Sequence, residues 1–169
     1  MNAIFKRKRI RKFLDKEIED EKIERLLKAG MQAPSAINSQ PWEFLVVRDK
    51  ECIETISNMS IYSKPAKTST CCIITLFNEE YLSKFENYRW VEQDMGACTQ
   101  NILLQAVEEN LGGVWLGTYP DMERVNYLKE HFNIPENVYP YSVVVLGYPT
   151  EDYTGTDRFD EGRIHYETY

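Results

Sequence analysis

The chain has 169 residues, 43% of them hydrophobic and 12% aromatic, which suits one compact domain with its own core, so we expect a single domain over residues 1–169. No secretory signal pattern and no run of about 18 apolar residues occurs, which indicates a cytoplasmic protein with no membrane segment. The net charge of −7 disfavours a nucleic-acid partner, and the spacing of the four cysteines and two histidines indicates neither a disulfide framework nor a metal site.

The first predicted elements are two helices and a loop. Residues 1–14 are basic and predict a short helix or a helix-to-loop transition. A second helix, with Asp20 or a neighbour as its N-cap, is indicated by apolar residues at helical spacing, namely Ile23, Leu26, Leu27, Gly30 and Met31. It should end before Pro34, because the residue that precedes a proline disfavours the helical conformation. Residues 35–41 are then predicted to form an irregular polar loop.

Beyond this loop, strands and helices alternate. The patterns predict strands over residues 43–47, 71–77, 114–116 and 141–149, and helices over residues 52–59, 89–110 and 122–132. The continuous apolar run 71–77 is typical of a strand covered on both faces. Gly112 and Gly113 are predicted to cap the end of the long helix. The order of elements predicts an α/β or α+β sandwich, with helices around one sheet.

Two segments bear on assembly. The helix 89–110 carries a wide apolar stripe, which suggests burial against its own sheet and against a second copy of the chain. The last twenty residues are polar and extended by pattern, yet they contain Tyr153, Phe159, Tyr166 and Tyr169 and are too aromatic for a solvated tail. From the helix stripe we expect a homodimer.

Cations gather near both ends of the chain. Residues 1–12 hold six of the 20 basic side chains and no acid, whereas the other 157 residues hold the remaining 14 and all 27 acids. Such a cluster suits one compact anion, and guanidinium groups bind phosphate oxygens in a bidentate manner. On a helix, Arg7 and Arg11 would share a face. Arg158 and Arg163 add two cations near the C-terminus; a solvated basic face and surface ion pairing are the alternatives.

Two further segments suit contact with a flat heterocycle. Residues 33–42 place hydroxyl and amide side chains between two prolines, where they offer hydrogen-bond donors and acceptors. In residues 112–118, glycines permit close approach of the backbone, and Trp115 with Leu116 could cover an aromatic ring. A capped turn and a core strand are the alternatives. No dinucleotide fingerprint, P-loop or nucleophile elbow occurs, so hydrolase and kinase chemistry are unsupported.

Together these segments resemble the nitroreductase family of FMN-dependent oxidoreductases, from about Phe5 to His165. The ordered motifs are Arg-x-x-Ile-Arg-Lys-Phe, Ala-Pro-Ser-x-x-Asn-x-Gln-Pro-Trp, Gly-x-x-Trp-x-Gly and Arg-Phe-Asp-x-x-Arg-x-His. The resemblance implies an α+β fold, an α-β-α sandwich whose mostly antiparallel central sheet is surrounded by helices. It also implies an intertwined homodimer with two FMN molecules at the interface. NADH or NADPH would be the electron donor, and a nitroaromatic, quinone or similar small electrophile the acceptor, in ping-pong order through flavin N5.

The resemblance also implies site residues. The FMN phosphate and ribityl chain would be held by Arg7, Lys8, Arg9 and Arg11, completed from the C-terminal arm by Arg163, with Arg158 as a second candidate. The loop that the partner subunit places against the flavin would comprise Pro34, Ser35, Ala36, Asn38 and Gln40. The segment along the ring would be Trp115, Leu116, Gly117 and Thr118, with a backbone N–H of Gly117 or Thr118 reaching N5. Many family members have serine where Arg9 stands. The flavin carries the chemistry, so no catalytic side chain is expected.

Other functions stay open at this point. A flavin-binding redox sensor or carrier with little turnover has the same motifs. A dehalogenating or flavin-consuming relative would need lid segments for which 169 residues leave little room. A nucleic-acid-binding module would depend on Lys6 to Lys12 alone and would show salt-sensitive affinity.

Overall fold

The computed structural model describes residues 2–153 and 155–169. In this part of the chain, four strands form one sheet in the order β1-β2-β4-β3, and every neighbouring pair is antiparallel. The strands are β1 (Trp42–Val47), β2 (Cys71–Asn78), β3 (Gly112–Gly117) and β4 (Val138–Gly147). Strands β2 and β4 lie at the centre, and β3 forms one edge.

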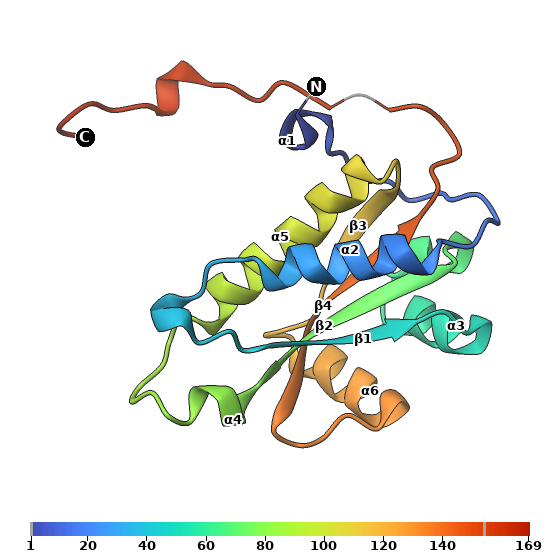
Figure 1. Cartoon of the computed structure of the whole chain (residues 1–169), viewed down its shortest axis with the longest axis horizontal. Helices are drawn as coiled ribbons and strands as arrows, with labels where there is room; N and C mark the ends of the chain where they lie inside the picture. The colour runs from blue at the N-terminus through green and yellow to red at the C-terminus, as the bar shows by residue number, and fades with distance from the viewer. Residues whose placement is uncertain (1, 154) are drawn as a thin grey trace.

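Helices cover both faces of the sheet. Figure 1 shows α2 (Asp20–Met31) and α5 (Val91–Glu108) on one face, and α3 (Lys50–Asn58) and α6 (Met122–Phe132) on the other. The shorter helices are α1 (Ala3–Lys6), α4 (Glu79–Leu82) and the 3₁₀ helices η1 (Ala36–Asn38), η2 (Lys64–Thr68) and η3 (Glu161–Arg163). The predicted α+β sandwich with a mostly antiparallel sheet is thereby confirmed.

The central strand β2 explains why two helical layers form. All eight of its residues are buried. Cys71 and Ile73 pack into the core beneath α2 and α5, whereas Cys72 and Ile74 pack into the core beneath α3 and α6. Because side chains alternate between the faces of a sheet, one unbroken apolar run supplies both cores.

Helix α5 ends differently from the prediction. Its last residue is Glu108, and Asn110 adopts a left-handed conformation with φ of 59° after it. Asparagine tolerates this region because its short polar side chain bonds locally. The predicted glycine C-cap is therefore wrong, and Gly112 and Gly113 instead begin β3.

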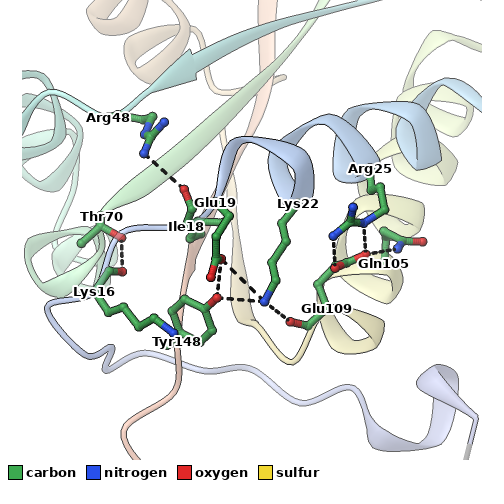
Figure 2. Close-up of polar contacts among 10 residues, drawn as sticks. All are labelled: Lys16, Ile18, Glu19, Lys22, Arg25, Arg48, Thr70, Gln105, Glu109 and Tyr148. Carbon is green, nitrogen blue, oxygen red and sulfur yellow. Dashed lines mark hydrogen bonds and ion pairs between the residues drawn. The ribbon is translucent and has the colours of Figure 1, made fainter.

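A polar network ties the C-terminal end of α5 to its neighbours (Figure 2). Lys22 of α2 donates from Nζ to the Glu109 carbonyl at 3.0 Å and to the Tyr148 hydroxyl at 2.8 Å. Arg25 binds the Glu109 carboxylate through Nε and Nη2 at 2.6 and 2.8 Å. The Tyr148 hydroxyl in turn donates to Glu19 at 2.5 Å. This network holds α2, α5 and the end of β4 together.

The C-terminal segment leaves the sandwich. In Figure 1 it runs past α1 and away from the sheet. Tyr153 donates to the Leu111 carbonyl at 3.0 Å, but Phe159, Tyr166 and Tyr169 are exposed. The expectation that the aromatic side chains of this segment are covered is therefore wrong for the single chain, apart from Tyr153.

Candidate functional site

The basic N-terminal segment lies along the free edge of β3. It is helical only over α1, so the predicted pairing of Arg7 with Arg11 on a helix face is wrong. Arg9 instead forms a parallel bridge with Gly113, and the Ile10 N–H donates to the Gly113 carbonyl at 3.1 Å. A sheet edge offers unpaired backbone groups, and these determine the conformation of the segment.

Two glycines make this docking possible. A Cβ added to Gly112 would lie 2.7 Å from Ile10, and one added to Gly147 would lie 2.8 Å from Phe13. Both distances are shorter than van der Waals contact between carbon atoms permits. The N-terminal segment therefore seats Ile10 and Phe13 where neighbouring strands lack side chains.

The cations of this segment are uncompensated. Lys8, Arg9 and Arg11 are exposed, and Arg7 is half-buried. Within residues 2–153 and 155–169, none of the four forms an ion pair with an acidic side chain. Arg9 bridges Gly113, and Arg11 directly follows Ile10, which packs against Gly112. The start of β3 is thus flanked by positive charge that is available to an anion.

At the other end of β3, the backbone N–H groups of Gly117 and Thr118 differ in whether they are free to bind a ligand. The Thr118 N–H donates to the Tyr141 carbonyl at 3.2 Å, on the β4 side, whereas the Gly113 carbonyl accepts from Ile10 on the opposite side. Successive residues of an antiparallel strand alternate their N–H and C=O groups toward and away from the partner. Gly117 therefore has the orientation of Gly113, and its N–H points to the open edge. Of the two predicted donors, Gly117 is the available one.

The surroundings of Gly117 are open. Gly117 is exposed, and a Cβ added there would meet no atom within 4 Å. Arg124 of α6 donates from Nη1 to the Gly117 carbonyl at 2.9 Å. About 13 Å separates Gly117 from Gly113, at about 3.3 Å per residue. The free edge of β3 therefore has a basic end at Gly113 and, at Gly117, an end where no side chain fills the space.

The other predicted residues of this strand lie in three environments. Trp115 is half-buried, with its ring in an edge arrangement 6.0 Å from that of Tyr141. Leu116 is buried in the core beneath α3 and α6, so the prediction that its side chain covers a ring is wrong. The Thr118 hydroxyl is buried and has no hydrogen-bond partner among the described residues.

The polar loop is fixed to the start of α5. The Ala36 N–H donates to the Asp94 carboxylate at 2.9 Å. Within the loop, the Gln40 N–H donates to Ser35 Oγ at 3.0 Å and the Gln40 amide donates to Asn38 Oδ1 at 2.8 Å. Pro34, Asn38 and Gln40 are exposed. Across residues 2–153 and 155–169, no hydrogen bond joins this loop to the basic segment or to β3.

The C-terminal arginines also stand apart in the single chain. Arg163 forms an ion pair with its own Asp160 at 3.0 Å, and its side chain is exposed. Arg158 is exposed as well. The single chain thus places Arg9 beside Gly113, at the opposite end of the β3 edge from Gly117, and leaves the loop and the C-terminal arginines elsewhere.

Three residues of this region escaped the sequence analysis. Asp94 and Tyr88 contact the loop, and Arg124 contacts Gly117. Asp94 carried a signal, because it lies one helical turn before Cys98 on the apolar stripe of α5, where an acid is unusual. Arg124 carried none, since its contact depends on how α6 packs beside β3.

Two kinds of feature are absent from the described residues. No helix there is both long enough and apolar enough to cross a lipid bilayer. No group of three or more histidine, cysteine, aspartate or glutamate side chains there is arranged to hold a metal ion.

Comparisons with known proteins agree with this fold. A sequence model of the nitroreductase family matches residues 4–70 and 61–148. A protein of Archaeoglobus fulgidus, provisionally named NADH dehydrogenase/NAD(P)H nitroreductase, is 43% identical over all of this chain and 98% of its own length.

Solved structures give the same result. A crystal structure of a Clostridium acetobutylicum protein, provisionally named NADH oxidase, has a TM-score of 0.94 and 47% identity, covering 99% of this chain and 100% of that chain. A provisionally named nitroreductase of Desulfovibrio desulfuricans, solved in complex with FMN, has a TM-score of 0.82 and 28% identity, covering 99% of this chain and 95% of that chain. By sequence and by fold, the chain belongs to the nitroreductase family.

Proposed function

We propose that this protein binds FMN along the open edge of β3 and passes reducing equivalents from NAD(P)H to a small electrophilic acceptor, such as a nitroaromatic or a quinone. The protein is an NAD(P)H-dependent oxidoreductase of the nitroreductase family, with FMN as its cofactor. The observation that carries the proposed site is one strand edge with uncompensated cations at Gly113 and an unfilled space at Gly117.

The residues present fit an FMN molecule. Arg7, Lys8, Arg9 and Arg11 would hold the phosphate, because guanidinium and ammonium groups form charge-assisted hydrogen bonds with phosphate oxygens. At the other end, the space beside Gly117 admits a flat ring, and the free N–H of Gly117 would donate to it. When bound, FMN would supply the redox chemistry, accepting electrons from the nicotinamide and passing them to the acceptor in ping-pong order.

Other residues would orient the ring. Arg124 holds the Gly117 carbonyl and so fixes the peptide plane that follows it. Trp115 would border the ring through its half-buried side chain, whereas the side chains of Leu116 and Thr118 are buried and the Thr118 N–H is already bonded to Tyr141. These residues exclude water and position the cofactor, which is the task that a protein performs for a flavin.

We further propose that the site is completed by a second copy of the chain in a homodimer. Pro34, Ser35, Ala36, Asn38 and Gln40 would come from the partner, as would Arg163 or Arg158. The support is that the loop and the C-terminal segment present exposed polar and aromatic groups away from the β3 edge of their own chain. Residues 1–169 would then act as one FMN-binding domain of a cytoplasmic enzyme.

The first experiment measures cofactor content and reduction. The purified protein should be yellow, should release FMN on denaturation, and should lose its visible flavin absorption when mixed anaerobically with NADH or NADPH. Reoxidation by a nitroaromatic or quinone should restore the band. FMN binding with no reduction by either nicotinamide would instead favour a sensor or carrier, and a colourless protein without FMN affinity would refute the proposed site.

A second experiment tests the open end of the site. Gly117→Ala adds a methyl group that no atom of the chain opposes, so the FMN-free variant should unfold at the wild-type temperature. FMN binding or turnover should nevertheless fall, because the methyl group enters the space assigned to the ring. Gly112→Ala gives the contrast, since its methyl group meets Ile10 and should lower stability without any ligand. Unchanged FMN affinity and turnover in Gly117→Ala would place the ring elsewhere.

A further inference from the structure

The loop of residues 35–40 has a strained backbone. Ile37, Asn38 and Gln40 adopt φ angles of 49°, 55° and 48°, in the left-handed region that residues with a Cβ rarely enter. Ile37 is β-branched, for which this conformation is an outlier, and its side chain is 67% exposed. Packing of the Ile37 side chain therefore does not explain the conformation, and such strain persists only where the surroundings enforce it.

A buried carboxylate supplies that enforcement. Asp94 is 4% exposed and lies in the first turn of α5. Its Oδ1 accepts from the Ala36 N–H at 2.9 Å, and its Oδ2 accepts from Ser39 Oγ at 3.2 Å. These bonds lie on either side of Ile37 and Asn38, and the second lies directly before Gln40. Figure 1 shows η1, which contains Ile37, beside the start of α5.

Tyr88 reinforces the same contact. Its hydroxyl donates to Asp94 Oδ2 and lies 2.6 Å from Ser39 Oγ. Burial, followed by the hydrogen bond to Asp94, raises the pKa of Tyr88 to about 12, so the hydroxyl stays protonated and can donate at neutral pH. The carboxylate thus receives one backbone and two side-chain donors, and such charge-assisted bonds are stronger than neutral ones.

We infer that Asp94 is a positioning residue that holds the loop of residues 35–40 in its strained shape, so that Asn38 and Gln40 are prearranged for the FMN of the partner subunit. This inference rests on the proposed function. The exposed side chains of Asn38 and Gln40 are already joined at 2.8 Å, so the loop presents them as one unit. Prearranged groups bind more tightly because less conformational freedom is lost on binding.

A simpler role is possible for Asp94, because an acid in the first turn of a helix stabilises the helix dipole. The two roles differ in what they affect. Stabilisation of the helix alone would change the unfolding temperature and leave FMN affinity unchanged in the folded protein. Positioning of the loop would change FMN affinity and the local protection of the loop.

The test compares FMN affinity in a graded series of full-length variants. Asp94→Asn keeps one acceptor oxygen, whereas Asp94→Ala removes both. Affinity should fall about tenfold in Asp94→Asn and roughly a hundredfold in Asp94→Ala, as expected for loss of hydrogen bonds to a charged group. Glu92→Gln is the matched control, because it removes an exposed carboxylate from the same helical turn and should bind FMN as the wild type does.

Amide hydrogen exchange distinguishes failure of the inference from failure of the proposed function. Peptides spanning residues 35–40 should exchange faster in Asp94→Ala, while β2 and the rest of α5 keep their protection. If the wild type binds no FMN, the proposed function fails, yet the exchange experiment still tests whether Asp94 holds the loop. Wild-type FMN affinity and loop protection in Asp94→Ala would overturn the inference.

A milder pair of variants covers the case in which Asp94→Ala does not fold. Ser39→Ala and Tyr88→Phe each remove one hydroxyl from the carboxylate and should weaken FMN binding a few-fold while leaving the sheet protected. The inference is overturned if both variants bind FMN as the wild type does.

Discussion

The two ends of helix α5 carry polar networks of opposite character. At the N-terminal end, Asp94 is buried and accepts hydrogen bonds from a loop with strained backbone angles. At the C-terminal end, Lys22, Glu109 and Tyr148 form a half-buried network among regular elements, with Arg25 at the surface (Figure 2). Each network surrounds one helix terminus, but only the first involves a segment of the proposed site.

The two networks differ in how strongly loss of one partner should affect stability and cofactor binding. The C-terminal network has redundant partners near solvent, so water can replace a lost contact at small cost. The buried carboxylate has three donors and little access to water, so loss of the carboxylate leaves those donors unpaired. We therefore expect the N-terminal network to be the more sensitive one and to affect cofactor binding as well as stability.

The largest expected effect on stability comes from Asp94→Ala. The Ala36 N–H and the Ser39 and Tyr88 hydroxyls would lose their acceptor, which should lower the free energy of unfolding by about 2–3 kcal/mol. Chemical denaturation of the variant and the wild type, at equal protein and FMN concentrations, measures the difference. A loss no larger than that of a surface variant would remove the distinction between the two ends.

A smaller effect is expected from Lys22→Met, which removes the donor at the C-terminal end of α5. The bonds to the Glu109 carbonyl and the Tyr148 hydroxyl would be lost, but the methylene groups that pack beside them would be kept. Unfolding free energy should fall by about 1 kcal/mol, and FMN affinity should be unchanged. Weaker FMN binding in this variant would show that the C-terminal network also influences the site.

Acid titration tests the C-terminal network separately. The hydrogen bond from Tyr148 is the main cause that lowers the pKa of Glu19 to about 2. A carboxyl group whose pKa is lower in the folded state contributes stability above about pH 4.5 and loses it as the pH falls toward 2. The stability of Tyr148→Phe should therefore decline less steeply over this range. If the unfolding temperatures of the wild type and Tyr148→Phe changed in parallel with pH, the Tyr148 hydrogen bond would not be the main cause of the lowered pKa of Glu19.

The smallest effect is expected from Lys28→Ala on α2. Lys28 pairs with Glu24 at 2.6 Å, but both side chains are exposed. Solvent screens such a pair, so the unfolding temperature should not change measurably. If Lys28→Ala lowered stability as much as Lys22→Met, solvent exposure would not explain why the two contacts differ in their contribution to stability.

Much of the fold could be predicted from the sequence because its signals are local. The apolar run of β2 and the spacing in α2 and α5 indicate strands and helices directly. The failures concern contacts between distant segments. Charges alone made residues 7–11 look helical, whereas the edge of β3 determines their conformation. Gly112 and Gly113 resembled a helix cap, but Asn110 already provides the left-handed residue.

The candidate site was predictable in residue types but less so in geometry. The cations at Arg9 and Arg11 and the open Gly117 stood out by composition and by resemblance. Which backbone N–H is free, Gly117 or Thr118, follows from strand alternation and required the pairing of β3 with β4. Arg124 and Tyr88 reach their contacts from other elements, so no local pattern could identify them.

The paired glycines at the start of β3 and the end of β4 have a consequence for protein engineering. Gly112 and Gly147 face each other in register, and each accommodates one apolar side chain of the N-terminal segment. Gly112 and Gly147, together with Ile10 and Phe13, thus determine where the basic segment lies. The charge itself comes from other residues of that segment. Libraries that retune anion preference can vary Arg9 and Arg11 freely, provided that both glycines stay fixed.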